Sequence, residues 1–151
     1  MIEITDAKII KYQFEVPINR SPADIWDVMI NKIDAWWMDD FRALGNGSIV
    51  TLNAERGGQL IESNADGADL EWYRIQMVSP GQALYLVGYM APDWGGPTTS
   101  MLKLAVEERS DGGALVVSDA LLGNVTEASA NSAESGWKIL FGDGLKNFAE
   151  R

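Results

Sequence analysis

Apolar and polar residues alternate with a period of two between residues 10 and 16, which is typical of a strand with one buried face. The apolar members are Ile10, Tyr12, Phe14 and Val16. Pro17 follows directly and is expected to end this strand. The period then changes to that of a helix, so the strand is the first element of the chain.

Residues 21 to 24 have the composition of a helix start. Ser21 supplies a capping hydroxyl, Pro22 suits the first helical position, and Asp24 places a negative charge near the positive end of the helix dipole. An apolar stripe follows on one face, and its members are Trp26, Met29, Ile30 and Ile33. Residues 34–37 are predicted to form a second short helix or a bend.

From Gly47 onward, short runs of β-forming residues are separated by turn residues, which predicts an antiparallel meander. The predicted strands are 48–52, 59–62, 70–78, 83–90, 98–108 and 114–122. The last two flank a sequence with an Asp111-Gly112 step, which suits a tight hairpin turn. Leu102, Leu104 and Val106 mark the buried face of the first strand of this hairpin.

Two of these strands do not reveal their buried face unambiguously. In 70–78 the face with Tyr73, Ile75 and Met77 is the more apolar one, and we assign it to the interior, although a β-bulge would reset the alternation. Strand 83–90 is apolar on both faces, so its orientation stays open.

The chain ends with a predicted helix at residues 135–148. One stripe of this helix is apolar, at three- and four-residue steps, and consists of Trp137, Leu140, Phe141, Leu145 and Phe148. Residues 123–134 are small and polar and suggest a loop, with Glu127 or Ser129 as an earlier start. For Gly136, Gly142 and Gly144, close packing or a break near Gly142 is favoured over space left for a ligand.

Together these elements predict one domain, 1–151, of the α+β class. Residues 16–28, with Ser21-Pro22-Ala23-Asp24 and on to Trp36-Trp37, resemble the opening of START-like (SRPBCC) domains, which have the helix-grip fold of Bet-v-like proteins. The resemblance is strongest to domains named after the activator of the heat-shock-protein-90 ATPase. Gly57-Gly58, Val78-Ser79-Pro80 with Leu84, and Gly136-Trp137 resemble the same domains.

The resemblance implies a curved antiparallel sheet wrapped around a long C-terminal helix, with two short helices after the first strand. It also implies an apolar cavity between helix and sheet, which in such domains takes small hydrophobic molecules. A minority of such domains are cyclases, dehydratases or hydrolases. Because chaperone stimulation by the eukaryotic activator depends on a separate N-terminal domain, and the chain begins with the helix-grip strand, we do not expect that activity here.

Composition excludes several kinds of chemistry. The chain has no cysteine and no histidine, which removes thiolate and imidazole nucleophiles and metal sites built on those ligands. The net charge of −10 disfavours nucleic acid and anionic membranes as partners. With no signal peptide, no spanning segment and no cofactor or metal motif in the sequence, we expect a cytoplasmic protein, monomeric or homodimeric, without cofactor or metal.

The candidate ligand-binding residues are mostly aromatic. Six tryptophans in 151 residues exceed what the centre of one small core needs, so some are expected to line a pocket or its mouth. Trp94 lies in a loop rich in glycine and proline that could cover an opening, whereas Trp26 and Trp137 suit packing better. The full set of candidates is Trp37, Tyr73, Ile75, Tyr89, Trp94, Leu102, Trp137 and Phe141.

Catalysis would fall to a carboxylate or a tyrosine. Asp119 shares a strand face with Leu115, Val117 and Leu121, and a carboxyl group held among them could act as a general acid or base. The favoured alternative is that Asp119 faces water while the other face, with Val116, points inward. Glu71 is a weaker candidate, and Asp39-Asp40 is expected to be a solvated pair.

Three functional hypotheses follow. The first is binding of a small hydrophobic or aromatic molecule between the C-terminal helix and the sheet. The second is an enzyme of the cyclase or dehydratase type, and the third is an interaction or chaperone-associated protein whose cavity is filled by its own side chains.

Overall fold

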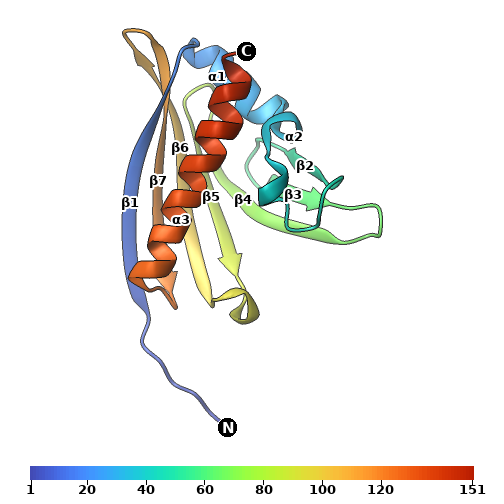
Figure 1. The fold of residues 1–151 in the computed structure, drawn as a ribbon. Coiled ribbons are helices and arrows are strands. Elements are labelled where there is room, and N and C mark those ends of the chain that lie inside the picture. The colour runs from blue at the N-terminus through green and yellow to red at the C-terminus, as the bar shows by residue number, and fades with distance from the viewer.

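The computed structural model describes residues 1–151, and its strands form one seven-stranded sheet (Figure 1). The strand order is β1-β7-β6-β5-β4-β3-β2, and all neighbouring pairs are antiparallel. The strands are β1 (Lys8–Ile18), β2 (Ile49–Leu52), β3 (Gln59–Ser63), β4 (Asp69–Ser79), β5 (Ala83–Met90), β6 (Thr98–Arg109) and β7 (Gly112–Gly123). The predicted α+β class and helix-grip arrangement are confirmed.

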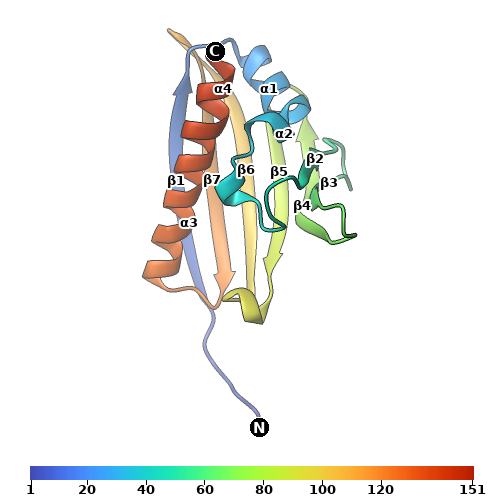
Figure 2. The same cartoon turned by 45° about the vertical axis from the view of Figure 1, so that its right-hand side comes forward.

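The helices lie on one face of this sheet (Figures 1 and 2). Two short ones, α1 (Pro22–Asn31) and α2 (Ile33–Trp36), follow β1 as predicted, and the Ser21 hydroxyl caps α1 by accepting from the Asp24 backbone N–H at 3.2 Å. The C-terminal segment comprises α3 (Glu127–Ile139), a π-helical stretch (Leu140–Lys146) and α4 (Asn147–Ala149). No helix is both long enough and apolar enough to cross a bilayer.

The C-terminal helix begins at Glu127, the earlier of the two starts considered, and residues 127–134 are helix, not loop. Thr126 and Ser129 form a reciprocal cap, each side chain accepting from the backbone N–H of the other, at 3.0 Å for the Ser129 N–H and 2.9 Å for that of Thr126. The small polar residues that suggest a loop are therefore the cap and first turns of a helix.

Of the three helical glycines, only Gly144 is explained by close packing. A Cβ atom there would lie 2.7 Å from the carbonyl oxygen of Trp36. Glycine therefore lets the C-terminal helix pack directly against the backbone of α2. At Gly142 a Cβ would meet nothing within 4 Å, and at Gly136 it would meet only the Phe41 ring, at 3.7 Å. The break expected near Gly142 takes the form of the π-helical stretch, through which the helix continues.

Two strand predictions are corrected by the pairing. Strand β1 continues past Pro17 to Ile18, because β1 is an edge strand and a missing N–H can face outward there. In β4 a bulge between Ile75 and Met77 resets the alternation. Ile75 is buried, but Met77 is 52% exposed and does not face the interior.

The core lies between the sheet and its helices and contains 23 buried apolar residues. One carboxylate, that of Glu62, is fully buried beside this core. It accepts hydrogen bonds from the backbone N–H groups of Ala43 and Leu44, at 3.0 and 2.8 Å. The Ser48 hydroxyl and the Trp72 indole also donate to it, at 2.7 and 3.1 Å. Glu62 therefore ties the loop before β2 to strands β3 and β4.

The Glu62 carboxylate is expected to stabilise the fold. Burial by itself raises its pKa, but the four donors outweigh burial and hold the pKa below its usual range. Because the folded pKa is the lower one, this stabilisation is present above the unfolded value, about 4.3, and is lost as the pH falls through the folded value. We predict that Glu62→Gln, which leaves buried donors unpaired, lowers the free energy of unfolding by about 1–3 kcal/mol at neutral pH.

Denaturant unfolding measures this loss, and Glu108→Gln, at an exposed position of β6, is the matched control that should leave stability unchanged. An equal effect of the two substitutions would contradict the role assigned to Glu62.

Candidate functional site

A cavity of about 440 Å³ lies between α3 and strands β4 to β7. Its helix side is formed by Ser129, Ala133 and Trp137, which follow one another at four-residue steps on a single face of α3. The first two of these side chains are small. The helix therefore leaves space above the sheet in its first turns, and only Trp137 begins to fill that space.

Aromatic side chains form much of the cavity wall. Tyr73 of β4 and Trp137 of α3 face each other with ring centroids 6.0 Å apart, and Trp72 lies beside them. Tyr89 and Trp94 line the mouth and are 70% and 58% exposed. The cavity thus has an aromatic interior and an opening towards the turn between β5 and β6.

The turn at the mouth, which contains a short helix at Pro92–Trp94, is tied to the end of β7. The Asn124 amide donates to the carbonyl oxygens of Gly95 and Gly96, both at 3.2 Å. Gly95 has a φ of +95°, and a Cβ at Gly96 would lie 1.9 Å from the Met90 carbonyl oxygen, so neither position accepts a larger residue without rearrangement.

A chain of hydrogen-bonded polar side chains includes Tyr73, Ser100 and Asp119, which line the cavity, and extends to Tyr12 of β1. The Tyr12 hydroxyl donates to Asp119 Oδ2 at 2.7 Å, and the Ser100 hydroxyl donates to Asp119 Oδ1 at 2.8 Å. The hydroxyl groups of Ser100 and Tyr73 are 2.7 Å apart and hydrogen-bonded. The chain connects four strands, β1, β7, β6 and β4, on the face of the sheet that the helices cover.

Strand register brings these side chains together. Tyr12 is paired directly with Asp119 across β1 and β7, and Gly88 of β5 is paired with Ser100 of β6. A Cβ at Gly88 would lie 2.8 Å from Tyr73 Cε1 and 2.5 Å from the Trp72 carbonyl oxygen. The absence of a side chain at Gly88 is therefore what lets the Tyr73 ring lie across β5 and reach Ser100.

Burial controls the ionisation of this chain. Asp119 is 4% exposed, and its burial raises the pKa of the carboxyl group. The hydrogen bonds from Tyr12, Ser100, the Ala120 backbone and the Trp137 indole act in the opposite direction but do not cancel that effect. Burial and the nearby Asp119 also raise the pKa values of Tyr12 and Tyr73, so both phenols keep their protons at neutral pH.

No protein-family model and no curated protein matches the sequence, but solved structures do. An uncharacterized protein from Rhizobium leguminosarum matches with a TM-score of 0.75 at 15% identity, covering 99% of both chains. The Mll3558 protein from Rhizobium loti matches with a TM-score of 0.70 at 19% identity, covering 91% of this chain and 95% of that one. Ara h 8.0201 matches with a TM-score of 0.68 at 10% identity, covering 94% and 98%.

The chain has the Bet v 1-like helix-grip fold. At these low identities the matches concern the fold alone. The narrower resemblance to the heat-shock-protein-90 ATPase activators stays a prediction.

The helix-grip fold brings four of the eight candidate ligand-binding residues to one cavity and separates the others from it. Tyr73, Tyr89, Trp94 and Trp137 line the cavity. The remaining four are in the packed core, at 1–3% exposure, and are Trp37, Ile75, Leu102 and Phe141. Their inward direction agrees with the sequence pattern, but other side chains fill the space in front of them.

An aromatic cluster explains why the cavity ends where it does. Trp36 lies 5.8 Å from Trp37 and 6.0 Å from Phe141, and Phe141 in turn stacks on Trp137 at 5.2 Å, measured between ring centroids. Trp37 also contacts Trp72, at 5.7 Å. This cluster fills the gap between helix and sheet near α2. Trp137 packs within the cluster and also borders the cavity. Both roles considered for it from the sequence, core packing and lining of a pocket, therefore apply.

The favoured expectation that Asp119 faces water is wrong. Asp119 points inward with Leu115, Val117 and Leu121, the shared face noted in the sequence, because those three side chains require the core. Sequence reasoning missed Ser100 and Tyr12 as partners of Asp119. Ser100 is two residues from Leu102 on the same strand, so the alternation already predicts that it shares the buried face. Only the strand register places Tyr12 opposite the Asp119 carboxylate.

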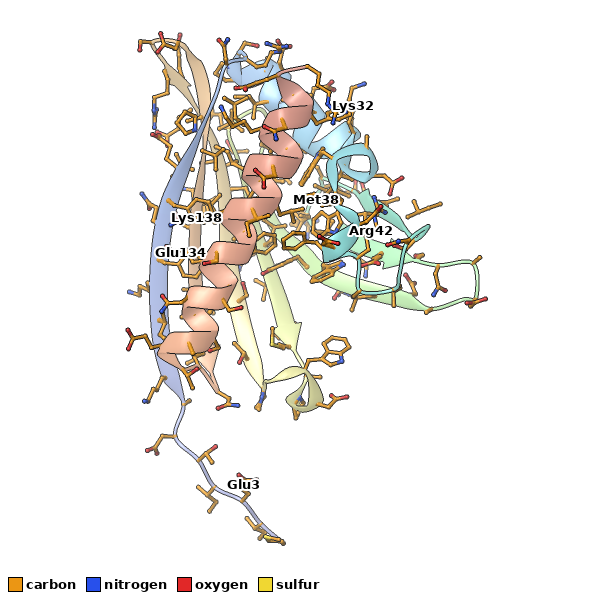
Figure 3. All side chains as sticks on the ribbon, in the orientation of Figure 1. Glu3, Lys32, Met38, Arg42, Glu134 and Lys138 are labelled. Carbon is orange, nitrogen blue, oxygen red and sulfur yellow. The ribbon has the colours of Figure 1, made fainter.

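The other acidic candidates are arranged differently. Glu71 borders the cavity, pairs with Arg74 at 2.9 Å and also accepts from the Gln59 amide. Asp39 and Asp40 are exposed, and Asp39 pairs with Arg42 at 3.3 Å. Figure 3 shows Arg42 near strands β2 and β3, away from Glu134 and Lys138 on the other side of the C-terminal helix. No group of three acidic side chains is close enough to hold a metal ion.

A second hollow, of about 520 Å³, lies on the outer face of the sheet, which no helix covers (Figures 1 and 2). Lys11, Tyr85, Met101 and Lys103 line it, and the Lys103 ammonium lies 5.2 Å from the centre of the Tyr85 ring. It is a surface groove without an enclosing wall, so the cavity under α3 is the stronger candidate site.

Gly88→Ala is predicted to disturb the site through Tyr73. The new methyl group would overlap both the Tyr73 ring and a β4 carbonyl oxygen, so we expect a loss of about 1–3 kcal/mol in unfolding free energy. Near-ultraviolet circular dichroism should report the displaced Tyr73–Trp137 pair. Gly142→Ala, which meets no atom within 4 Å, is the control and should not lower stability. Equal behaviour of the two variants would refute the steric role of Gly88.

The free energy of unfolding of Asp119→Asn, relative to that of the parent protein, is predicted to increase as the pH rises. The pKa of Asp119 is higher in the folded protein than in the unfolded chain, where it is about 3.9. Ionisation of Asp119 therefore lowers the free energy of unfolding as the pH rises from the unfolded pKa to the folded pKa, and has no such effect below the unfolded pKa. Asparagine avoids that loss. Unfolding free energies of variant and parent, compared from acid to neutral pH, test this sign. Glu62→Gln provides the opposite trend, and a parallel trend in the two variants would contradict the assignment.

Proposed function

We propose that the protein binds a small molecule with an aromatic or other apolar body in the cavity under α3, without covalent chemistry. The supporting observation is the cavity of about 440 Å³, which has aromatic walls and one polar chain on its floor. Ligand sites in proteins commonly have volumes of roughly 300–1,000 Å³ and combine apolar walls with a few placed polar groups.

The same features describe how such a molecule would be held. Burial of its apolar surface against Trp72, Tyr73 and Trp137 would supply affinity, at about 25 cal/mol per Å² before ordering costs. The polar chain at Ser100 and Asp119 would orient it. Tyr89 and Trp94 stand at the entrance, where they would contact a ligand as it enters.

A second candidate, an enzyme of the cyclase or dehydratase type, is supported by Asp119. Its pKa is raised, it lies in a cavity, and it is linked to Ser100 and Tyr73 by hydrogen bonds, which suits a general acid or base. This hypothesis requires turnover of a bound molecule that Asp119→Asn abolishes while binding persists. The third hypothesis, a core filled by its own side chains, has less support because the hollow under α3 is open.

The binding proposal is tested by filling the cavity. Ala133→Phe places a ring into the cavity from α3, whereas Ala128→Phe makes the same change at an exposed position of the same helix. With Nile red, a neutral dye that fluoresces in apolar surroundings, we predict that Ala133→Phe weakens binding at least about tenfold, or about 1.4 kcal/mol.

Ala128→Phe should bind the dye as the parent protein does. Far-ultraviolet circular dichroism confirms that both variants are folded. Equal dye binding by parent and Ala133→Phe would place the dye elsewhere and reject the cavity as the binding site.

A further inference from the structure

The charged side chains that line the cavity are all acidic. They are Asp119 on the floor and Glu71 at the edge, and no lysine or arginine lines the cavity. Lys138 is on α3, but it pairs with Glu134 at 3.7 Å and lies 5.5 Å from the centre of the Phe14 ring of β1. Figure 3 shows Glu134 and Lys138 on the β1 side of the helix. The protein therefore supplies no positive charge to the cavity.

Asp119 is a buried carboxylate without a cationic partner. The structure contains seven ion pairs, and none includes Asp119, whereas Glu71 is already paired with Arg74. The groups that donate to Asp119 are all neutral: the hydroxyl groups of Tyr12 and Ser100, the Ala120 backbone N–H and the Trp137 indole. A buried carboxylate is expensive unless a positive charge or enough donors compensate it. Asp119 has neutral donors only, and no positive charge compensates it in the protein alone.

Aromatic residues line the cavity in which this carboxylate lies. They include Trp72, Tyr73 and Trp137. Aromatic faces attract cations, most strongly where water is excluded. The cavity thus combines a charge-accepting floor with walls that favour a positive charge.

Resting on the proposed function, we propose that the natural ligand carries a positively charged nitrogen, as an organic ammonium with an aromatic or apolar body, and that this nitrogen binds at Asp119. An anionic ligand would meet the charge of Asp119 at short range, and a neutral one would leave it unpaired. The net charge of −10 adds to this preference by raising the local concentration of cations.

Binding of an ammonium is coupled to the ionisation of Asp119. The groups that face this carboxyl are Tyr12 of β1, Ser100 of β6, Tyr73 of β4 and Trp137 of α3, with the charges of Glu71 and Glu134 farther out. Burial raises the pKa of Asp119 in the free protein, and an ammonium favours the ionised form. Affinity for the cation therefore rises with pH through the pKa of Asp119 and levels off above it.

Three probes that share one ring system and differ in the charged group test the inference. Tryptamine is a cation, tryptophol is its neutral alcohol analogue, and indoleacetate is an anion. By isothermal titration calorimetry at neutral pH, tryptamine should bind at least about tenfold tighter than tryptophol, and indoleacetate weakest, in line with about 1.4 kcal/mol per tenfold. Asp119→Asn should remove the preference for tryptamine over tryptophol.

Asp143→Asn makes the same change of charge at an exposed position of the C-terminal helix and should keep the preference, which separates local pairing from the net charge. Should Asp119→Asn not fold, the pH profile of the parent protein gives a second readout. Tryptamine affinity should fall as the pH is lowered through the acidic range, while tryptophol affinity stays level.

Equal or tighter binding of tryptophol or indoleacetate overturns the inference and leaves the proposed function standing. The same conclusion follows if none of the three binds to protein that still takes up Nile red at the cavity. If Nile red also fails to bind, the proposed function fails together with the inference.

Discussion

The architecture depends on uneven packing of the C-terminal helix against the sheet. Its second half is anchored by Leu140, Phe141 and Leu145, which are all at most 2% exposed, and Gly144 lets it approach the backbone of α2. In its first half only Ala130 is buried against the sheet, and Ser129 and Ala133 line the cavity; all three side chains are too short to fill the gap. Large side chains at one end and small ones at the other therefore create both the core and the cavity.

Two buried carboxylates show how the surroundings of a charge decide its role. Glu62 accepts from four donors, two of them backbone N–H groups, and its pKa lies below its usual range despite burial. Asp119 is comparably buried, but there burial outweighs the hydrogen bonds and the pKa is raised. The first carboxylate holds a loop on the sheet. The second is a buried carboxylate in the cavity, and its ionised form is destabilised unless a positively charged partner binds beside it.

The polar chain on the cavity floor also restricts the enzyme hypothesis. Tyr12, Ser100 and Tyr73 surround Asp119 with hydroxyl groups whose protons stay in place at neutral pH, so the carboxyl group is the titratable member. Any acid or base chemistry would therefore pass through Asp119. Any non-covalent recognition of charge would depend on the same residue, so the two functions differ in turnover and not in the residue involved.

Sequence periodicity identified the buried face correctly in β6, where one face is apolar and the pairing is regular. Leu102, Leu104 and Val106 face the core as predicted, and strand β5 has the bounds that its turn residues indicate. The pattern failed at Met77, because a bulge inserts one residue and moves the following side chains to the other face. It also failed at residues 127–134, where small polar residues cap and begin a helix.

The sequence by itself determined the order of elements, the α+β class and the aromatic character of the interior, because these depend on local periodicity and composition. Tertiary structure decided which aromatic side chains border empty space and which pack against one another, as the contrast between Tyr73 and Trp37 shows. It also placed Tyr12 and Ser100 on Asp119 through strand register. Register and cavity volume arise from contacts between residues distant in the chain, and no local pattern contains them.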